Sequence, residues 1–293
     1  MNKPKTLYPG MTAVHLGCML GSPRHLALRR CGAAISRFAG RRVCSTMDQP
    51  EQITLRYFAC QGRGQILRYM LFDSGRPFTD EIIGSEAEYN ALPPGAMGIC
   101  NYLPVYEGPD GSGGTMQLGQ SKAITYHVAM LLGYTPATAR ESAKASEVFC
   151  LASEDVYSAI LLGIWQTHMT GNPALVAAIP KMRQRLGNLE TMLGARGALG
   201  ASRPVDFSDF AALFAVDLIE QLFTPPAAAS VLEPVPTVRG NAALLRQRSG
   251  VQAALERRCE RMTGCPGEPE VVAAFREMEE KALEGAAGEY GGS

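Results

Sequence analysis

The pattern of hydrophobic and polar positions divides residues 51–133 into short strands and helices. Ile53–Phe58 alternates with a period of two and is rich in β-forming residues, which predicts a strand. Glycines at 62 and 64 break it, and residues 65–72 then predict a largely buried helix that ends near Gly75. The further expected elements are strands at 77–83, 103–106 and 115–118, a loop at 91–98, and a helix at Ser121–Leu132. The initial strand–helix–strand order predicts that the first two strands are parallel.

The strand patterns stop after about residue 139, and long helical patterns replace them. We expect helices at 141–170, 173–194, 206–223, 241–249, 250–261 and 270–283. Asp206 is expected to cap the third of these, with Asp209 completing a capping box. The pattern therefore predicts an α/β domain at 51–133 and an all-helical domain at 140–262. A last helix and a flexible tail are expected at 263–293.

Charge adds a third segment to this picture. The chain has 28 basic and 28 acidic residues, so its total gives no sign of a nucleic-acid partner. Residues 1–50 nevertheless hold eight basic residues and one acidic residue, Asp48, which leaves 20 basic and 27 acidic residues in the body. An Arg-rich, acid-poor start is typical of a transit peptide and predicts a mitochondrial or plastid location. The alternative is that translation starts at Met47 and that the protein is cytoplasmic. No run of about 18 apolar residues was found, so no membrane-spanning helix is expected.

Cysteine and histidine usage argues against a metal site. Five of the eight cysteines follow residue 50, and none of them forms a Cys-x-x-Cys pair. The four histidines do not cluster with each other or with the cysteines. We therefore expect neither a zinc site nor a disulfide framework.

Four motifs resemble one known family. Tyr57-Phe58 ends the first strand, and Gly62-Arg63 opens the first helix. Leu103-Pro104 resembles a segment with a cis-proline, and Gln120-Ser121 resembles a pair that opens a third helix. The capped helix at Asp206 is the fourth motif. Together they resemble the cytosolic glutathione S-transferases of the tyrosine class (sigma, alpha, mu and pi) over residues 52–262.

This resemblance implies a fold, a reaction and an assembly. The fold is a thioredoxin-like α/β domain followed by an all-helical domain. The reaction conjugates the thiolate of glutathione to an apolar electrophile, with glutathione as co-substrate and without a metal or redox cofactor. The assembly is a homodimer that pairs the α/β domain of one chain with the 141–170 helix of the other.

The resemblance also implies roles for particular residues. A thiol with a pKa of about 8.5 is only about 3% ionised at pH 7, and a hydrogen bond from the Tyr57 hydroxyl would favour the thiolate. Arg63 and the N-terminus of the first helix add positive charge there. Gln120 and Ser121 are expected to bind the γ-glutamyl carboxylate. The backbone of Leu103, before a cis Pro104, is expected to pair with the cysteinyl amide. Taken alone, Tyr57 is better explained as an ordinary half-buried strand aromatic, and the other motifs favour the functional role.

Some positions depart from the family pattern or remain open. Gln61 stands where the motif has its first Arg, and residues 83–102 contain neither the Trp nor the Lys that would hold the glycine carboxylate. Tyr102 takes the place of that Lys. Asp155 is a candidate for the γ-glutamyl amine across a dimer. Candidates for the electrophile pocket, which core packing explains equally well, are Tyr157, Trp165, His168 and Met169.

Two other functions compete with conjugation. Cys60 lies three residues after Tyr57, near the place where thiol-type relatives have a nucleophilic cysteine, so a glutathione-dependent thiol oxidoreductase is the first alternative. The second is an offshoot of the fold that binds a ligand or isomerises a substrate.

Overall fold

The computed structural model describes residues 52–279. The predicted leader at 1–50 lies outside these residues, and so does the part of the predicted tail from residue 280 onward.

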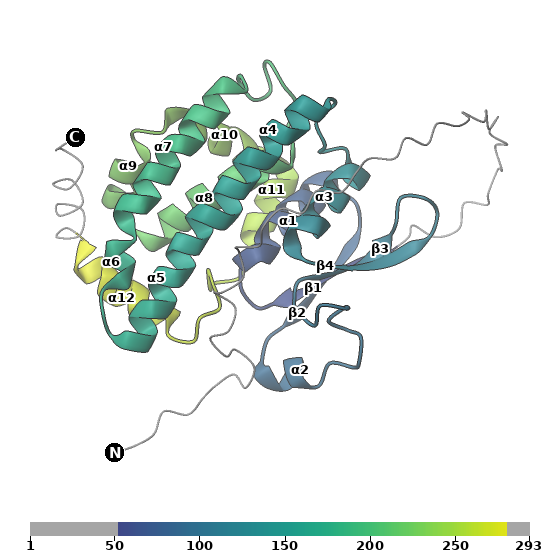
Figure 1. Ribbon diagram of the computed structural model, residues 1–293, viewed down its shortest axis with the longest axis horizontal. Helices are drawn as coiled ribbons and strands as arrows, with labels where there is room; N and C mark the ends of the chain where they lie inside the picture. The colour runs from purple at the N-terminus through teal and green to yellow at the C-terminus, as the bar shows by residue number, and fades with distance from the viewer. Residues whose placement is uncertain (1–51, 280–293) are drawn as a thin grey trace, which may run out of the picture. The chain divides into compact units, whose positions relative to one another are not determined.

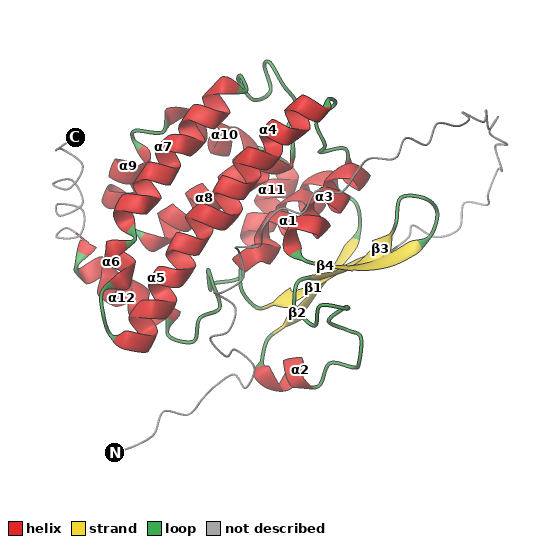
Figure 2. Cartoon of the chain, viewed as in Figure 1, coloured by secondary structure: helices red, strands yellow, loops and turns green. Residues whose placement is uncertain are grey.

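The α/β domain is a four-stranded sheet with helices beside it (Figures 1 and 2). Its elements are β1 (Ile53–Phe58), the short 3-10 turn η1 (Gly62–Gly64), α1 (Gln65–Ser74), β2 (Phe78–Ile83), α2 (Glu86–Asn90), β3 (Val105–Pro109), β4 (Thr115–Gly119) and α3 (Ser121–Leu132). The strand order is β2-β1-β3-β4. Strands β1 and β2 are parallel, as predicted, and the other neighbours are antiparallel. This arrangement confirms the thioredoxin-like α/β domain.

Local chemistry explains most of these boundaries. Helix α1 ends at Gly75, whose positive φ of 66° closes the helix without a Cβ penalty. Strand β3 begins two residues later than the pattern predicted, because Pro104 has no N–H to give to a ladder. Helix α2 was not predicted. It is capped by Ser85, whose side chain accepts a hydrogen bond from the Glu88 N–H.

The second domain is entirely helical within the described residues. Its elements are α4 (Ala139–Cys150), η2 (Leu151–Val156), α5 (Tyr157–Thr170), α6 (Ala174–Ala177), α7 (Ile179–Ala195), α8 (Phe207–Leu222), α9 (Pro225–Leu232), α10 (Pro236–Arg246), α11 (Ser249–Glu256) and α12 (Glu268–Glu277). Helix α8 is buried along nearly its whole length and has the predicted capping box of Asp206 and Asp209. One hydrophobic cluster joins the domains, with Leu67 and Tyr69 of α1 and Phe210 and Phe214 of α8 among its members.

The predicted helix at 141–170 exists as one run of 32 residues, Ala139–Thr170. It contains a π-helical turn, η2, between α4 and α5. By length and composition alone this run is long and apolar enough to cross a membrane, with a mean hydropathy of 1.5 over its most apolar window. No such helix was expected. In the structure 56% of that window is buried inside the protein, which is the behaviour of a core helix.

Prolines account for two of the helix starts that the pattern did not predict, those of α9 and α10. Helix α9 was not predicted, and α10 begins five residues before its predicted start. Both open with proline at the first position, Pro225 and Pro236, where the missing N–H has no helical partner to lose. The predicted helix at 173–194 is broken at Ala178, and α11 ends at Glu256 rather than near 261.

Candidate active site

Three of the predicted site segments meet at one edge of the sheet. Val105, the first residue of β3, pairs with Arg56 of β1 and with Gly119 of β4. Since β3 is antiparallel to both neighbours, its start lies beside the ends of β1 and β4. Tyr57, Leu103-Pro104 and Gln120-Ser121 are therefore brought together by the sheet. The Leu103-Pro104 peptide is cis, as predicted, and Gln120 has a positive φ of 69°.

Tyr57 is held in place by the turn that follows its own strand. Its side chain is 6% exposed, and the Arg63 N–H donates a hydrogen bond to its hydroxyl at 3.1 Å. A Cβ on Gly62 would lie 2.5 Å from that hydroxyl, and a Cβ on Gly64 would lie 2.5 Å from the ring. Only glycine permits such an approach. Burial raises the pKa of Tyr57, while the Arg63 N–H opposes this rise, so the hydroxyl keeps its proton at neutral pH.

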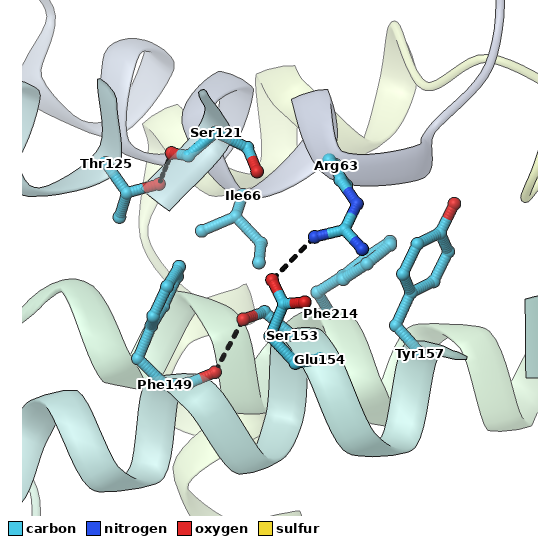
Figure 3. A pocket seen from close by; sticks show the side chains of 9 residues that line it. All are labelled: Arg63, Ile66, Ser121, Thr125, Phe149, Ser153, Glu154, Tyr157 and Phe214. Carbon is cyan, nitrogen blue, oxygen red and sulfur yellow. Dashed lines mark hydrogen bonds and ion pairs between the residues drawn. The ribbon is translucent and has the colours of Figure 1, made fainter. Parts of the chain in front are cut away.

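Arg63 reaches from the α/β domain to the long helix. Its guanidinium donates to Glu154 Oε1 at 2.5 Å and lies 5.9 Å from the centre of the Tyr157 ring. Figure 3 shows the guanidinium between these two side chains. Lys122 Nζ lies 3.8 Å from the same Glu154 oxygen. Two cations thus lie beside one carboxylate near the start of α3, so the net charge of these three side chains is positive.

A small cavity of about 10 Å³, roughly the space of one water molecule, lies at this junction. Arg63 and Ser121 line it, as does Tyr157, the one electrophile-pocket candidate among its lining residues. The other lining residues are Ile66, Thr125, Phe149, Ser153, Glu154 and Phe214 (Figure 3). Thr125 donates a hydrogen bond to the Ser121 carbonyl, and Ser153 donates to the Phe149 carbonyl.

Glu154 is the residue that the sequence analysis missed. It lies on η2, where the helix has a π turn. Such a turn changes which residues share a helix face, and π turns occur often at functional sites. The sequence analysis named the next residue, Asp155, which is exposed and whose carbonyl accepts a hydrogen bond from Arg185 at 2.5 Å. The available signal was the adjacent pair of acids. Glu154 pairs with Arg63 within the chain, and the role of Asp155 across a dimer stays a prediction.

The remaining candidates lie away from this cavity. Trp165 is half-buried, whereas His168 and Met169 are exposed on α5. Cys60 is 2% exposed, and burial raises the pKa of its thiol to about 12, despite Arg68 nearby and a hydrogen bond from Tyr57. Among residues 52–279, no group of three or more His, Cys, Asp or Glu side chains lies close enough together to hold a metal ion.

Known proteins resemble this chain in sequence and in fold. No family model matches the chain. The chain is 28% identical over 204 residues to glutathione S-transferase P of Bos taurus and, equally, to that of Capra hircus. The match covers 69% of this chain and 90% of each relative.

Solved structures share the fold. The pi-class glutathione S-transferase of Onchocerca volvulus is 21% identical with a TM-score of 0.58, over 70% of this chain and 92% of that one. A glutathione transferase family member from Pseudomonas fluorescens, solved with two glutathione bound, is 19% identical with a TM-score of 0.56, over 70% and 92%. A monomeric glutathione S-transferase from Necator americanus is 18% identical with a TM-score of 0.53, over 71% and 97%.

These matches define the class of protein. The chain is related in sequence to the cytosolic glutathione S-transferases and has their two-domain fold, which confirms the resemblance found in its motifs.

Proposed function

We propose that this protein is a glutathione S-transferase that conjugates the thiolate of reduced glutathione to apolar electrophiles, with Tyr57 stabilising the thiolate. The proposal depends most on one observation. The Tyr57 hydroxyl accepts a hydrogen bond from the Arg63 N–H at the end of β1, and its own proton, which faces the buried Cys60 thiol, can turn to the sulfur of bound glutathione. In the reaction the thiol proton goes to solvent, the sulfur forms a bond to carbon, and the leaving group departs with its electron pair. Glutathione is the co-substrate, and neither a metal nor a redox cofactor takes part.

The surroundings of the hydroxyl suit the binding of glutathione. Ser121 opens a helix that has no side-chain cap, so its first N–H groups are available to the γ-glutamyl carboxylate. Arg63 and Lys122 add positive charge beside them. The Leu103 backbone lies at the same edge of the sheet, and we expect it to pair with the cysteinyl amide.

Cys60 is poorly suited to the alternative role of a nucleophile. Reactive cysteines are partly exposed and have a lowered pKa, whereas Cys60 is buried and its pKa is raised to about 12. These properties favour Tyr57 over Cys60 as the catalytic residue and conjugation over thiol–disulfide exchange.

The test compares single-atom changes at two buried tyrosines. Tyr57→Phe removes the donor and keeps the shape, so conjugation of an aryl halide at pH 7 should fall about 10- to 100-fold, equivalent to a rise of one to two units in thiol pKa. Part of the loss should return at pH 9. The control Tyr69→Phe removes a hydroxyl from α1 and should leave the pH dependence unchanged. Full activity in Tyr57→Phe, or abolished activity in Cys60→Ser, would contradict the proposal.

Ser121 is tested through binding rather than rate. Ser121→Ala should weaken glutathione binding by about 1–3 kcal/mol, since a hydrogen bond to a charged group is lost. Calorimetric titration of the variant measures this change, and an unchanged dissociation constant removes Ser121 from the site.

The homodimer is part of the same proposal. Exposed apolar side chains occur on the α/β domain, at Ile99, Tyr102 and Met130, and on α5, at Leu162 and Met169. Pairing of the α/β domain of one chain with the α4–α5 helix of another would cover both sets. Light scattering coupled to size exclusion tests this assembly, and a monomer at micromolar concentration argues against it.

The leader supports a proposal on location. Its basic composition favours import into a mitochondrion or plastid, and a cytoplasmic start at Met47 is the alternative. Fluorescent fusions of the full chain and of the chain from Met47 should differ in location, and identical distributions would favour the cytoplasm.

A further inference from the structure

The turn that holds Tyr57 is itself held by a distant segment of the chain. We define the strap as residues 257–267, which connect α11 to α12 (Figure 1). The N–H groups of Gln61 and Gly62 donate to the carbonyls of Arg261 and Met262, each at 2.8 Å. The strap therefore holds two consecutive N–H groups of the turn.

The side chain of Gln61 strengthens this pairing. It is fully buried, and its Nε2 donates to the Cys259 carbonyl at 2.9 Å and to Gln221 Oε1 of α8 at 2.5 Å. The Gln221 amide in turn donates to the Gln61 Oε1 at 3.1 Å. A buried amide with partners for both of its ends fixes its surroundings, and a charged side chain at this place would be desolvated. Gln61 thus joins the turn, the strap and the core helix of the second domain.

The strap is anchored at its other end as well. The buried Glu268 carboxylate, at the start of α12, accepts hydrogen bonds from the N–H groups of Met262 at 2.5 Å and Thr263 at 2.7 Å. Gly264 packs on Cys60, so a Cβ at Gly264 would lie 3.2 Å from the Cys60 sulfur. The strap therefore contacts both neighbours of the Tyr57 hydroxyl, the turn at 61–63 and the Cys60 thiol.

The hydroxyl position depends on these neighbours. The Arg63 N–H that bonds to Tyr57 follows directly after the two N–H groups that the strap binds. Gly62 and Gly64 pack on the ring too closely to move toward it. A loosened turn would weaken the Arg63 hydrogen bond, and the Tyr57 hydroxyl would then be both a poorer and a less well directed donor.

Several charged or titratable groups surround this hydroxyl. The Arg68 guanidinium lies 5.8 Å from the centre of the Tyr57 ring. The groups that act on Tyr57 or on the adjacent Cys60 and Tyr157 are Arg63 and Arg68 of the α/β domain, Cys259 of the strap, Tyr157 of α5 and Glu268 of α12. None of these charges is altered by a change at Gln61.

We propose that the strap positions the Tyr57 hydroxyl for the glutathione sulfur, with Gln61 as the positioning residue. This inference rests on the proposed transferase function. Through Tyr57, residues 257–267 would then affect the ionisation of the glutathione thiol in the chemical step. Within residues 52–279, no hydrogen bond joins the Gln61 side chain to Ser121 or to the Arg63 side chain, the groups assigned to glutathione binding.

The experiment uses the full chain and three variants. Gln61→Met keeps the length of the side chain and removes its hydrogen bonds. Gly264→Ala presses the strap against Cys60 at a residue with φ of 74°. Gly200→Ala is the matched control, since Gly200 has φ of 76° and nothing within 4 Å of its added Cβ. Each protein is measured for the pH profile of kcat/KM with an aryl halide, for the dissociation constant of S-methylglutathione, and for Tm.

The expected result separates ionisation from binding. Gln61→Met should move the acidic limb of the pH profile up by about one unit, so that kcat/KM at pH 6.5 falls about tenfold and recovers above pH 9. The dissociation constant of S-methylglutathione, which has no thiol to ionise, should stay within about twofold. Gly264→Ala should shift the limb in the same direction by about half as much. Gly200→Ala should match the unmodified chain.

The outcomes that overturn the inference are distinct from failure of the proposed function. A wild-type pH profile in Gln61→Met, or a loss that is equal at every pH, means that Gln61 has only a structural role. If Gln61→Met does not fold, identical profiles for Gly264→Ala and Gly200→Ala overturn the inference instead. If the unmodified chain neither binds glutathione nor conjugates it, the transferase proposal itself fails, and the inference fails with it.

Discussion

Tyr57 and Tyr69 are two buried tyrosines with opposite surroundings. Tyr57 ends β1 and is 6% exposed, and Tyr69 lies on α1 and is fully buried. Burial raises the pKa of both hydroxyls, so both keep their protons at neutral pH. They differ in what faces the oxygen.

The Tyr69 hydroxyl donates its hydrogen bond to a carboxylate. It donates to Asp217 of α8, and Asp217 also accepts a hydrogen bond from Arg246 at 2.5 Å. Asp217 adds to the effect of burial and raises the pKa of Tyr69 further. The proton of Tyr69 therefore joins the two domains and is not available to a substrate.

The Tyr57 hydroxyl lies instead between the Arg63 N–H, which donates to it, and the protonated Cys60 thiol. The Arg63 N–H and the Arg68 guanidinium both lower the pKa of Tyr57 and so oppose the effect of burial. The two sites teach that burial alone does not make a tyrosine catalytic. The Tyr69 hydroxyl donates its hydrogen bond to a carboxylate, whereas the Tyr57 hydroxyl accepts one from the Arg63 N–H and faces only the protonated Cys60 thiol.

The largest effect that tests this comparison is expected at Asp217. Asp217→Leu leaves the Tyr69 hydroxyl buried without its partner and removes one partner of Arg246, which should lower the free energy of unfolding by about 3 kcal/mol. The control Glu220→Leu removes the other carboxylate of Arg246, which is 42% exposed and should matter by less than about 1 kcal/mol. Urea denaturation measures both. Equal losses would show that the Tyr69–Asp217 hydrogen bond contributes no more to the free energy of unfolding than the exposed Glu220–Arg246 ion pair.

A smaller effect is expected at Tyr69. Tyr69→Phe should lower the free energy of unfolding by about 2 kcal/mol, because a hydrogen bond to a buried carboxylate is lost. Since Arg246 still faces Asp217, the loss should be smaller than for Asp217→Leu. The acidic limb of the conjugation pH profile should not move, in contrast to Tyr57→Phe. A shifted limb in Tyr69→Phe would mean that the two hydroxyls are coupled.

The sequence predicted the frame of the molecule well. Strand β1 has the predicted limits, because alternation and the following glycines are local signals. Helix α3 has them as well, because it lies between Gln120 and Gly133. The meeting of Tyr57, Pro104 and Ser121 follows from strand order once the fold is recognised.

Other features depend on information that a local pattern does not hold. The hydrophobic pattern placed Tyr57 in a strand and Tyr69 in a largely buried helix, and it could not tell which one would face a carboxylate on α8. Glu154 depends on a π turn that changes the helix face by about one residue. Gln61 appeared only as a departure from a motif, because its partners Gln221 and Cys259 lie 160 and 198 residues away along the chain.

The smallest effect is expected at Cys60, which shares the surroundings of Tyr57. Its pKa is raised from its ordinary value to about 12, so the folded chain holds this proton more tightly than the unfolded chain, whose thiol has a pKa of about 8.5. The resulting stability is fully present below about pH 8.5 and is lost as the pH rises toward 12. Between pH 7 and pH 9.5 the protein should lose about 1 kcal/mol more than Cys60→Ser does, because serine has no proton to release in this range. Urea denaturation of both chains at the two pH values measures the difference. Equal losses would mean that the Cys60 thiol ionises as readily in the folded chain as in the unfolded one. Cys60 would then be a candidate nucleophile again, and the argument for Tyr57 as the catalytic residue would be weaker.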